Sequence, residues 1–209
     1  MSPSPLRPVT APFSGPDSQD EVVRRLLELA TESAPAVAAH MERTARLAKV
    51  LVKDLGLGEP LARMVVLTAR LHDIGKLGIP PWVLEKPAPL SEFESRMMRA
   101  HSIIGQEMLE RRGELLAVGP LVRSTHERWD GTGYPDRLRG GAIPLPSRIV
   151  AVCDAFDAMT KPRAYSRSMS IPAALDELRA CAGGQFDPGV ALAFCDMLDG
   201  RVDQLAQGA

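Results

Sequence analysis

The sequence LTARLHDIGKLGIPP, residues 67–81, contains the end of a helix and the start of an irregular segment. Apolar residues recur at helical spacing before this point and predict a helix over about 59–71. The two glycines and two prolines that follow forbid regular continuation of that helix. His72 and Asp73 therefore lie at a helix end, where two neighbouring side chains can be aimed at one point. The Asp73 carboxylate could then bridge two cations.

Helical spacing of apolar residues recurs along most of the remaining chain, whereas the alternation typical of strands is weak everywhere. Ser91 followed by Glu94 has the pattern of a capping box and predicts the start of a long amphipathic helix. The sequence therefore predicts an all-α fold, a helical bundle. The further helices are expected at about 22–29, 45–55, 93–109, 119–128, 147–159, 172–182 and 188–198.

One domain is expected over residues 20–199. Residues 1–19 are rich in proline and serine and show no apolar periodicity, so they predict a flexible tail. Residues 200–209 are expected to form a second tail. The glycine- and proline-rich stretch 130–146 predicts a long loop, and long loops within compact domains are usually functional.

Composition limits the partners of this protein. Its 25 basic and 26 acidic side chains give a formal net charge of −1, so no overall field attracts a nucleic acid polymer or an anionic membrane. No stretch approaches the ~20 apolar residues of a membrane span. Cys153, Cys181 and Cys195 form no CxxC pair and are expected to be buried apolar residues in a reducing compartment. These features predict a cytoplasmic protein that holds an anionic substrate through local charge.

The chain has four histidines, His40, His72, His101 and His126, and each lies on a different expected helix or at its end. A metal centre in a helical bundle takes its ligands from several facing helices, so the ligands lie far apart in the sequence. A lone histidine is more often a surface residue or a satisfied core residue. The dispersion of all four therefore favours a metal centre.

Seven segments together indicate a family. They are HMERTARLA around His40, LHDIGKLGIP, HSIIG at His101, HERWDGTGYP at 126–135, RIVAVCDAFDAMT around Asp154, PRAYS and GGQFDP. In their order and content they resemble the HD-GYP branch of the HD phosphohydrolase superfamily, over about residues 36–196. The resemblance implies a helical protein that holds two or three ions of iron, manganese or a similar metal. Many members hydrolyse the bacterial messenger cyclic di-GMP. By position, the implied metal ligands are His40, His72, Asp73, His101, His126 and Asp154.

These implied ligands offer nitrogen and carboxylate oxygen without thiolate, a set that suits iron or manganese, with nickel or zinc as alternatives. Two such ions about 3.5–4 Å apart can clamp a phosphodiester and lower the pKa of a bridging water, which gives a hydroxide for in-line attack. Asp73 and Lys76 are the expected catalytic residues. The resemblance places Lys76 against the scissile phosphate, where it offsets developing negative charge, and assigns Arg163 to the nucleotide phosphates. Solvated surface positions are the alternative for both cations.

The HERWDGTGYP segment contains residues expected to shape a loop. Gly131 and Gly133 permit backbone angles closed to other residues, and Pro135 stiffens the exit from the loop. Tyr134 and Trp129 could each stack on a base or anchor the loop as a buried aromatic side chain. We assign Gly131, Gly133, Tyr134 and Pro135 to shaping the loop.

Two positions depart from the family pattern. Thr125 stands where many members have a histidine, and a neutral hydroxyl is a poor replacement for an imidazole ligand. A dinuclear centre is therefore expected. The common RPYR is Arg163 to Ser166, RAYS, in this chain, so one of its two arginines is missing. This weakens the case for cyclic di-GMP, whose two phosphates profit from such cations, although Arg167 could compensate. Glu127 and Asp157 are expected to be structural or supporting carboxylates.

The leading hypothesis is a phosphodiesterase that hydrolyses a cyclic dinucleotide, with cyclic di-GMP first. Hydrolysis of another phosphoester is the close alternative. A second alternative is a non-catalytic module that senses a ligand or docks a signalling partner. All six implied ligands and Lys76 are present, and a pure binding module has no chemical need for them. Regulatory input could come from self-association as a homodimer or from a separate signalling protein.

Overall fold

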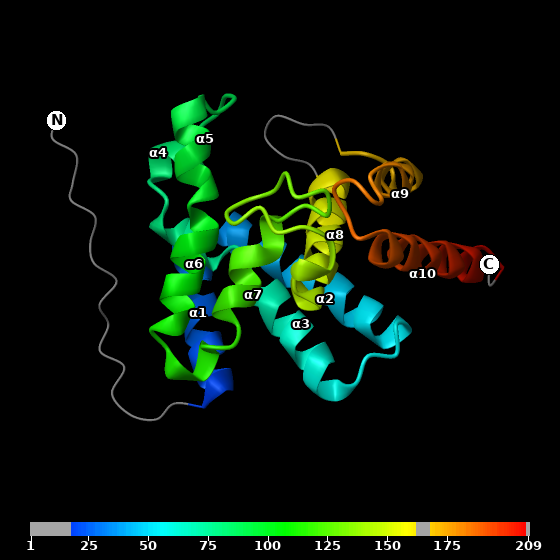
Figure 1. Ribbon diagram of the computed structural model, residues 1–209, viewed down its shortest axis with the longest axis horizontal. Coiled ribbons are helices and arrows are strands. Elements are labelled where there is room, and N and C mark those ends of the chain that lie inside the picture. The colour runs from blue at the N-terminus through cyan, green and yellow to red at the C-terminus, as the bar shows by residue number, and fades with distance from the viewer. Residues whose placement is uncertain (1–17, 162–167, 208–209) are drawn as a thin grey trace, which may run out of the picture.

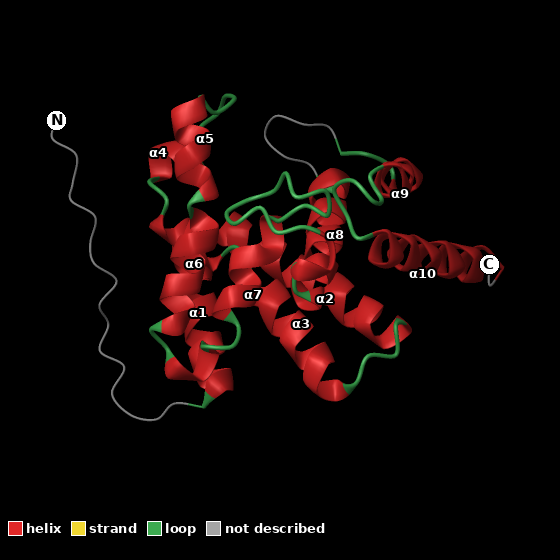
Figure 2. Ribbon diagram, in the orientation of Figure 1, coloured by secondary structure: helices red, strands yellow, loops and turns green. Residues whose placement is uncertain are grey.

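The structure, a computed structural model, describes residues 18–161 and 168–207. Within these ranges every regular element is a helix and no strand is present (Figure 2), which confirms the predicted all-α fold. The α-helices are α1 (Gln19–Ser33), α2 (Pro35–Asp54), α3 (Glu59–Leu71), α4 (Pro81–Leu84), α5 (Glu92–Arg99), α6 (His101–Glu110), α7 (Gly119–Arg123), α8 (Leu145–Thr160), α9 (Ile171–Ala180) and α10 (Pro188–Gln207). The 3-10 helices are η1 (Ile74–Gly78), η2 (Gly113–Leu115), η3 (Ser124–His126) and η4 (Gly140–Ala142).

Two apolar clusters form the core, and α2 and α3 contribute to both of them. One cluster joins these helices to α8, α9 and α10, and includes the buried Phe194. The other joins them to α1, α6 and α7, and includes the buried Met41. Figure 1 shows the two halves on either side of the α2–α3 pair, with α4 and α5 extending beyond α6. We call the boundary between these two halves, one built on each cluster, the seam. Residues that face the seam can therefore come from helices of both halves.

Local signals set several helix ends. Ser91 accepts a hydrogen bond from the Glu94 backbone, and the Glu94 side chain accepts one from the Ser91 backbone, which confirms the capping box. The end of α2 is closed by two backbone bonds, from Gly56 N–H to Lys53 O and from Leu57 N–H to Val52 O, the pattern of a Schellman motif. Gly56 therefore stops α2, as its position in the sequence predicted.

The single long helix expected over 93–109 is wrong, because the structure divides it at Ala100 into α5 and α6. The Ala100 N–H is shared between the Arg96 and Met97 carbonyl oxygens, both at 3.2 Å. At this point η1 packs closely on α6, and a Cβ added to Gly75 would lie only 1.9 Å from the His101 carbonyl oxygen. The break therefore occurs where η1 contacts the helix, so closely that only a glycine can occupy position 75.

Other helices also differ in length from their expectations. Those expected over about 22–29 and 45–55 are longer, since α1 spans Gln19–Ser33 and α2 spans Pro35–Asp54. The one expected over 119–128 ends at Arg123 and continues as η3, and α10 extends to Gln207, beyond the end expected near 198. Gly200 does not stop α10, since no proline follows and the residues after it are mostly helix formers. Residues 1–17, in the expected N-terminal tail, lie outside the described part of the chain.

The described helices and the charged surface both bear on possible partners. No helix in the described ranges combines the length and apolar character needed to cross a bilayer.

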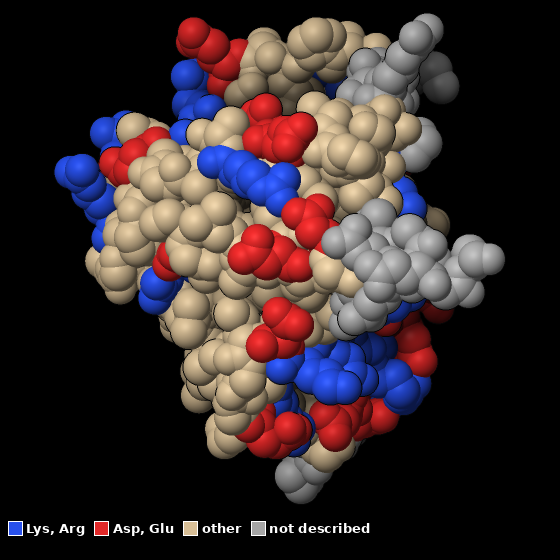
Figure 3. Space-filling view, turned by 90° about the vertical axis from the view of Figure 1, so that its right-hand side faces the viewer, with Lys and Arg blue, Asp and Glu red and all other residues tan. Residues whose placement is uncertain are grey.

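On the face shown in Figure 3, basic side chains lie next to acidic ones, in keeping with the near-balance of charge in the sequence. That face therefore does not present the uniform positive charge typical of polyanion-binding surfaces.

Candidate metal centre and substrate pocket

The seam between the two halves brings together residues that are distant in the sequence. The residues involved come from α2, the end of α3, the start of α6, η3 and α8. Hydrogen-bond and ion-pair distances connect all six residues that the sequence predicted as ligands: His40, His72, Asp73, His101, His126 and Asp154. Their role as ligands stays a prediction, and their convergence is a structural observation.

One group of side chains surrounds Oδ2 of Asp73. His72 Nε2 lies 3.5 Å and His40 Nε2 lies 3.8 Å from this oxygen. Asp154 Oδ1 lies 2.8 Å from His40 Nε2 and 3.8 Å from His72 Nε2. Two imidazole nitrogens and two carboxylate oxygens thus point at one small volume, a donor set that suits a divalent transition metal.

A second group surrounds the other oxygen of Asp73, Oδ1. His101 Nε2 lies 3.4 Å and His126 Nε2 lies 4.0 Å from it, and the two ring nitrogens are 2.9 Å apart. Asp73 belongs to both groups, and each of its oxygens faces a different pair of histidines. This is the arrangement in which one carboxylate can bridge two cations.

The tautomers of two histidines fit metal binding. His72 Nδ1 donates to the Ala69 carbonyl at 2.9 Å, and His101 Nδ1 donates to the Met98 carbonyl at 2.7 Å. A neutral imidazole that donates from Nδ1 keeps a lone pair on Nε2. His72 Nε2 and Asp73 Oδ1 are also buried without a hydrogen-bond partner in the described protein. Unpaired buried polar atoms are costly, and a bound cation would satisfy both of them.

His40 is oriented by a supporting carboxylate. Its Nδ1 donates to Asp157 Oδ2 at 2.7 Å, and Asp157 in turn accepts two hydrogen bonds from Arg43, at 2.7 and 2.8 Å. A carboxylate behind a ligating histidine fixes the ring and raises its basicity. This contact agrees with the expectation that Asp157 supports the ligands. Arg43 was missed in the sequence, although it lies three residues after His40 on the same helix.

The pKa shifts of three candidate ligands fit ligation, whereas at His40 burial is outweighed by Asp154 and Asp73, which raise the pKa of that ring. Burial, together with the charge of His101, lowers the pKa of His126 to about 3, and burial lowers the pKa of His101. Both rings are therefore neutral near pH 7, as a metal ligand must be. Burial would raise the pKa of Asp73, but the charge of Lys76 holds it well below its usual value. The Asp73 carboxylate is therefore ionised.

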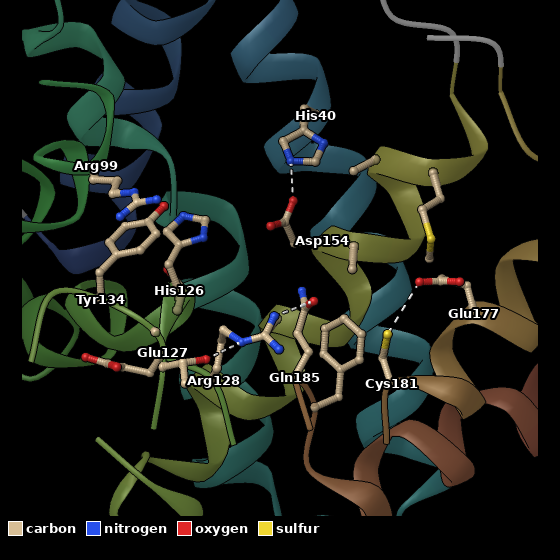
Figure 4. A pocket seen from close by; sticks show the side chains of 18 of the residues that line it. His40, Arg99, His126, Glu127, Arg128, Tyr134, Asp154, Glu177, Cys181 and Gln185 are labelled. Atoms are coloured by element: carbon tan, nitrogen blue, oxygen red, sulfur yellow. Dashed lines mark hydrogen bonds and ion pairs between the residues drawn. The ribbon is translucent and has the colours of Figure 1, made fainter. Parts of the chain in front are cut away.

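A pocket of about 550 Å³ opens above these residues, in the size range of small-molecule sites. Figure 4 shows His126, Tyr134 and Arg99 on one side of it and His40 with Asp154 on the other. Lys76 also lines the pocket, and its Nζ lies 2.6 Å from Asp73 Oδ2. A positively charged side chain thus lies directly beside the candidate metal centre.

The HERWDGTGYP loop lies against His126. The Tyr134 N–H donates to the His126 carbonyl at 3.2 Å, and the Tyr134 ring stacks on the His126 ring with 5.2 Å between centroids. Gly131 has a φ of +80°, which matches the expectation for it. Gly133 is needed for a different reason, because a Cβ there would lie 2.3 Å from the backbone nitrogen of Arg128. Pro135 follows Tyr134 at the exit of this segment.

Other residues of this motif have mainly structural contacts. Trp129 does not line the pocket, and the guanidinium carbon of Arg148 lies 5.7 Å from the centroid of its ring. Its side chain therefore anchors the loop. Buried Glu127 accepts backbone hydrogen bonds from Asp136 at 2.7 Å and Leu138 at 3.1 Å, in keeping with a structural carboxylate. Arg163 and the RAYS segment lie outside the described residues.

The far wall of the pocket was not identified from the sequence. Glu177 and Cys181 line it from the end of α9, and Gln185 lines it from the GGQFDP segment, where it accepts a hydrogen bond from Arg128 at 2.8 Å. Arg99 was also missed. Gln185 lies in a segment that helped to indicate the family, but nothing in the sequence marks any of these side chains as lining a pocket, because they meet only in the folded chain.

Comparison with known proteins identifies the family. A family model described as HD domain matches residues 22–190. The chain is 42% identical over 180 residues to the cyclic di-GMP phosphodiesterase response regulator RpfG of Xanthomonas campestris, covering 82% of this chain and 48% of that protein. It is 36% identical over 174 residues to the 3′3′-cGAMP-specific phosphodiesterase 2 of Vibrio cholerae, covering 82% of this chain and 33% of that protein. The chain therefore spans half or less of the length of these two relatives.

A solved structure agrees with this comparison at the level of the fold. An "HDG"Y"P" protein of Bdellovibrio bacteriovorus superposes with a TM-score of 0.64 at 19% identity, covering 87% of this chain and 62% of that one. The family match, the relatives and the fold all agree with the resemblance first indicated by HDIGK and HERWDGTGYP. The chain belongs to the HD domain family, in its HD-GYP branch.

Proposed function

We propose that this chain is a metal-dependent phosphodiesterase that hydrolyses a cyclic dinucleotide, with cyclic di-GMP as the first candidate. The observation that supports this most directly is the placement of Asp73, whose two oxygens face two separate pairs of histidines next to a pocket. Two cations held in this way can clamp one phosphodiester. The names of the two relatives support the cyclic dinucleotide class of substrate.

The side chains of the site then have separate tasks. When bound, the two ions, iron or manganese in the first instance, supply Lewis acidity and a water of low pKa. Lys76 offsets the negative charge that develops on the scissile phosphate. His40, His72, Asp73 and Asp154 would hold one ion, and Asp73, His101 and His126 would hold the other. Asp73 would contribute to both sites.

The reaction adds one water across a phosphodiester bond. The water oxygen bonds to phosphorus, the bond from phosphorus to the sugar oxygen breaks, and that oxygen leaves with a proton. No protein nucleophile is needed. Cys181, the cysteine that lines the pocket, suits that role poorly, because burial and the neighbouring Glu177 raise its pKa and keep it a thiol.

Product analysis on a panel of substrates tests this function. The anaerobically purified chain, loaded with iron or manganese, is incubated with cyclic di-GMP, 3′3′-cGAMP, cyclic di-AMP and bis(p-nitrophenyl) phosphate. We expect ring opening of at least one cyclic dinucleotide, loss of the activity with a chelator and its return with metal. Tight binding of a dinucleotide without turnover by the metal-loaded protein would favour a binding module. Turnover restricted to other phosphoesters would favour a different hydrolase.

The metal count provides a separate prediction. We expect two metals per fully loaded chain, measured by inductively coupled plasma mass spectrometry, because only two groups of ligand atoms surround Asp73 in the described residues. Thr125, which stands where many relatives have a histidine, is buried and donates its hydroxyl hydrogen to the Val122 carbonyl at 2.9 Å.

Thr125→Val is the matched variant for this count, since it keeps the shape of the side chain and removes the hydroxyl. The metal content of that variant should equal the wild-type value. Three tightly bound ions in the wild-type chain would contradict the dinuclear centre. A lower metal content in Thr125→Val would show that the hydroxyl does take part in metal binding.

A further inference from the structure

A cyclic dinucleotide presents two phosphodiesters to its binding site, and only one of them is cleaved in each reaction. Each diester carries a negative charge, so the phosphate that is not cleaved also profits from a cationic partner. The candidate metal centre and Lys76 are already assigned to the scissile phosphate under the proposed function. The second phosphate therefore needs a different cation at the pocket.

Few side chains that line the pocket are lysine or arginine. Among the described residues, these are Lys76, Arg99 and Arg128. Lys76 is paired with Asp73 at 2.6 Å. Arg128 is held on three sides, by Asp130 at 3.0 Å, by the Thr132 hydroxyl at 2.9 Å and by Gln185 at 2.8 Å. Both of these charges are already engaged by protein groups.

Arg99 differs from the other two cations. It is the last residue of α5, is exposed, and forms no ion pair within the described part of the chain. Its guanidinium carbon lies 5.4 Å from the centroid of the Tyr134 ring, and the Tyr134 ring also stacks on the His126 ring. This contact places the guanidinium at the pocket and leaves its N–H donors available. Figure 4 shows Arg99 and Tyr134 together on the His126 side of the pocket.

We propose that Arg99 binds the phosphate of the substrate that is not being cleaved, an assignment that rests on the proposed function. Its planar fork can donate two hydrogen bonds to one phosphate, which a lysine cannot match. Tyr134 is the positioning residue, since its ring holds the guanidinium against the same wall as His126. The pocket thereby acquires a second anion site.

Kinetics with two substrates tests the assignment. Cyclic di-GMP has two phosphates, whereas bis(p-nitrophenyl) phosphate is a diester with one. Arg99→Ala should raise KM for cyclic di-GMP about tenfold to a hundredfold, the loss expected for charge-assisted hydrogen bonds, while kcat changes little. Its kinetics with bis(p-nitrophenyl) phosphate and its metal content should equal those of the wild type. Arg99→Lys should recover part of the lost affinity.

Arg96→Ala is the matched control, because it removes the same charge from the same helix outside the pocket, where Arg96 lies 4.0 Å from Glu92. Its kinetics should be unchanged with both substrates. Two results would overturn the assignment of Arg99 and leave the proposed function standing. One is an Arg99→Ala variant with the same kinetics as an active wild type, and the other is an equal loss of activity on both substrates. A metal-loaded wild type that cleaves bis(p-nitrophenyl) phosphate but no cyclic dinucleotide would overturn the proposed function together with it.

Discussion

Replacing Asp73 with alanine is expected to abolish hydrolysis and to remove most of the bound metal, because this carboxylate is the one group shared by both sets of ligand atoms. His72→Ala should also abolish hydrolysis, but it removes a nitrogen from the first group only. The ion held near His101 and His126 should therefore persist in that variant. Metal content by plasma mass spectrometry and turnover of the cyclic dinucleotide measure both effects.

Asp176→Ala is a suitable control for these variants, since Asp176 is an exposed carboxylate on α9 that lies 3.4 Å from Arg179. It should keep full activity and metal. Thermal unfolding in the presence of a chelator shows whether each variant still folds without relying on the metal. Unchanged metal content and turnover in both Asp73→Ala and His72→Ala would remove these residues from the site and contradict the proposed centre.

Lys76→Ala is expected to behave differently from the ligand variants. Metal content should remain at the wild-type value, while turnover falls about 10²–10³-fold, the range seen when one group that stabilises developing charge is removed. The physical reason is that Lys76 lies beside Asp73 and lines the pocket, yet a protonated ammonium cannot bind a cation. Single-turnover kinetics on the metal-loaded protein separates this loss from a loss of binding.

Lys86→Ala removes the same kind of charge from an ion pair with Glu94, at 2.6 Å, away from the pocket residues. It should leave turnover unchanged. Lys76→Arg, which keeps the charge, should be more active than Lys76→Ala. Loss of metal from Lys76→Ala would contradict a role at the phosphate, and would indicate that Lys76 acts by holding Asp73 in place.

The sequence by itself determined the helical class, most of the helix positions and the candidate ligands. Helix formation depends on hydrogen bonds and side chains within a few residues, so the capping box at Ser91 and the stop at Gly56 were readable in advance. The ordered motifs around His72 and His126 were sufficient to indicate the HD-GYP family, which the comparisons confirm.

Only the tertiary structure decided how the candidate residues meet. The break at Ala100 coincides with the close approach of Gly75 from η1. The division of the Asp73 oxygens between two histidine pairs depends on how α2, α3, α6 and η3 pack. The stack of Arg99 on Tyr134 likewise joins α5 to a loop far along the chain. Contacts between distant segments leave no periodic pattern in the sequence, because they depend on residues that lie far apart in the chain.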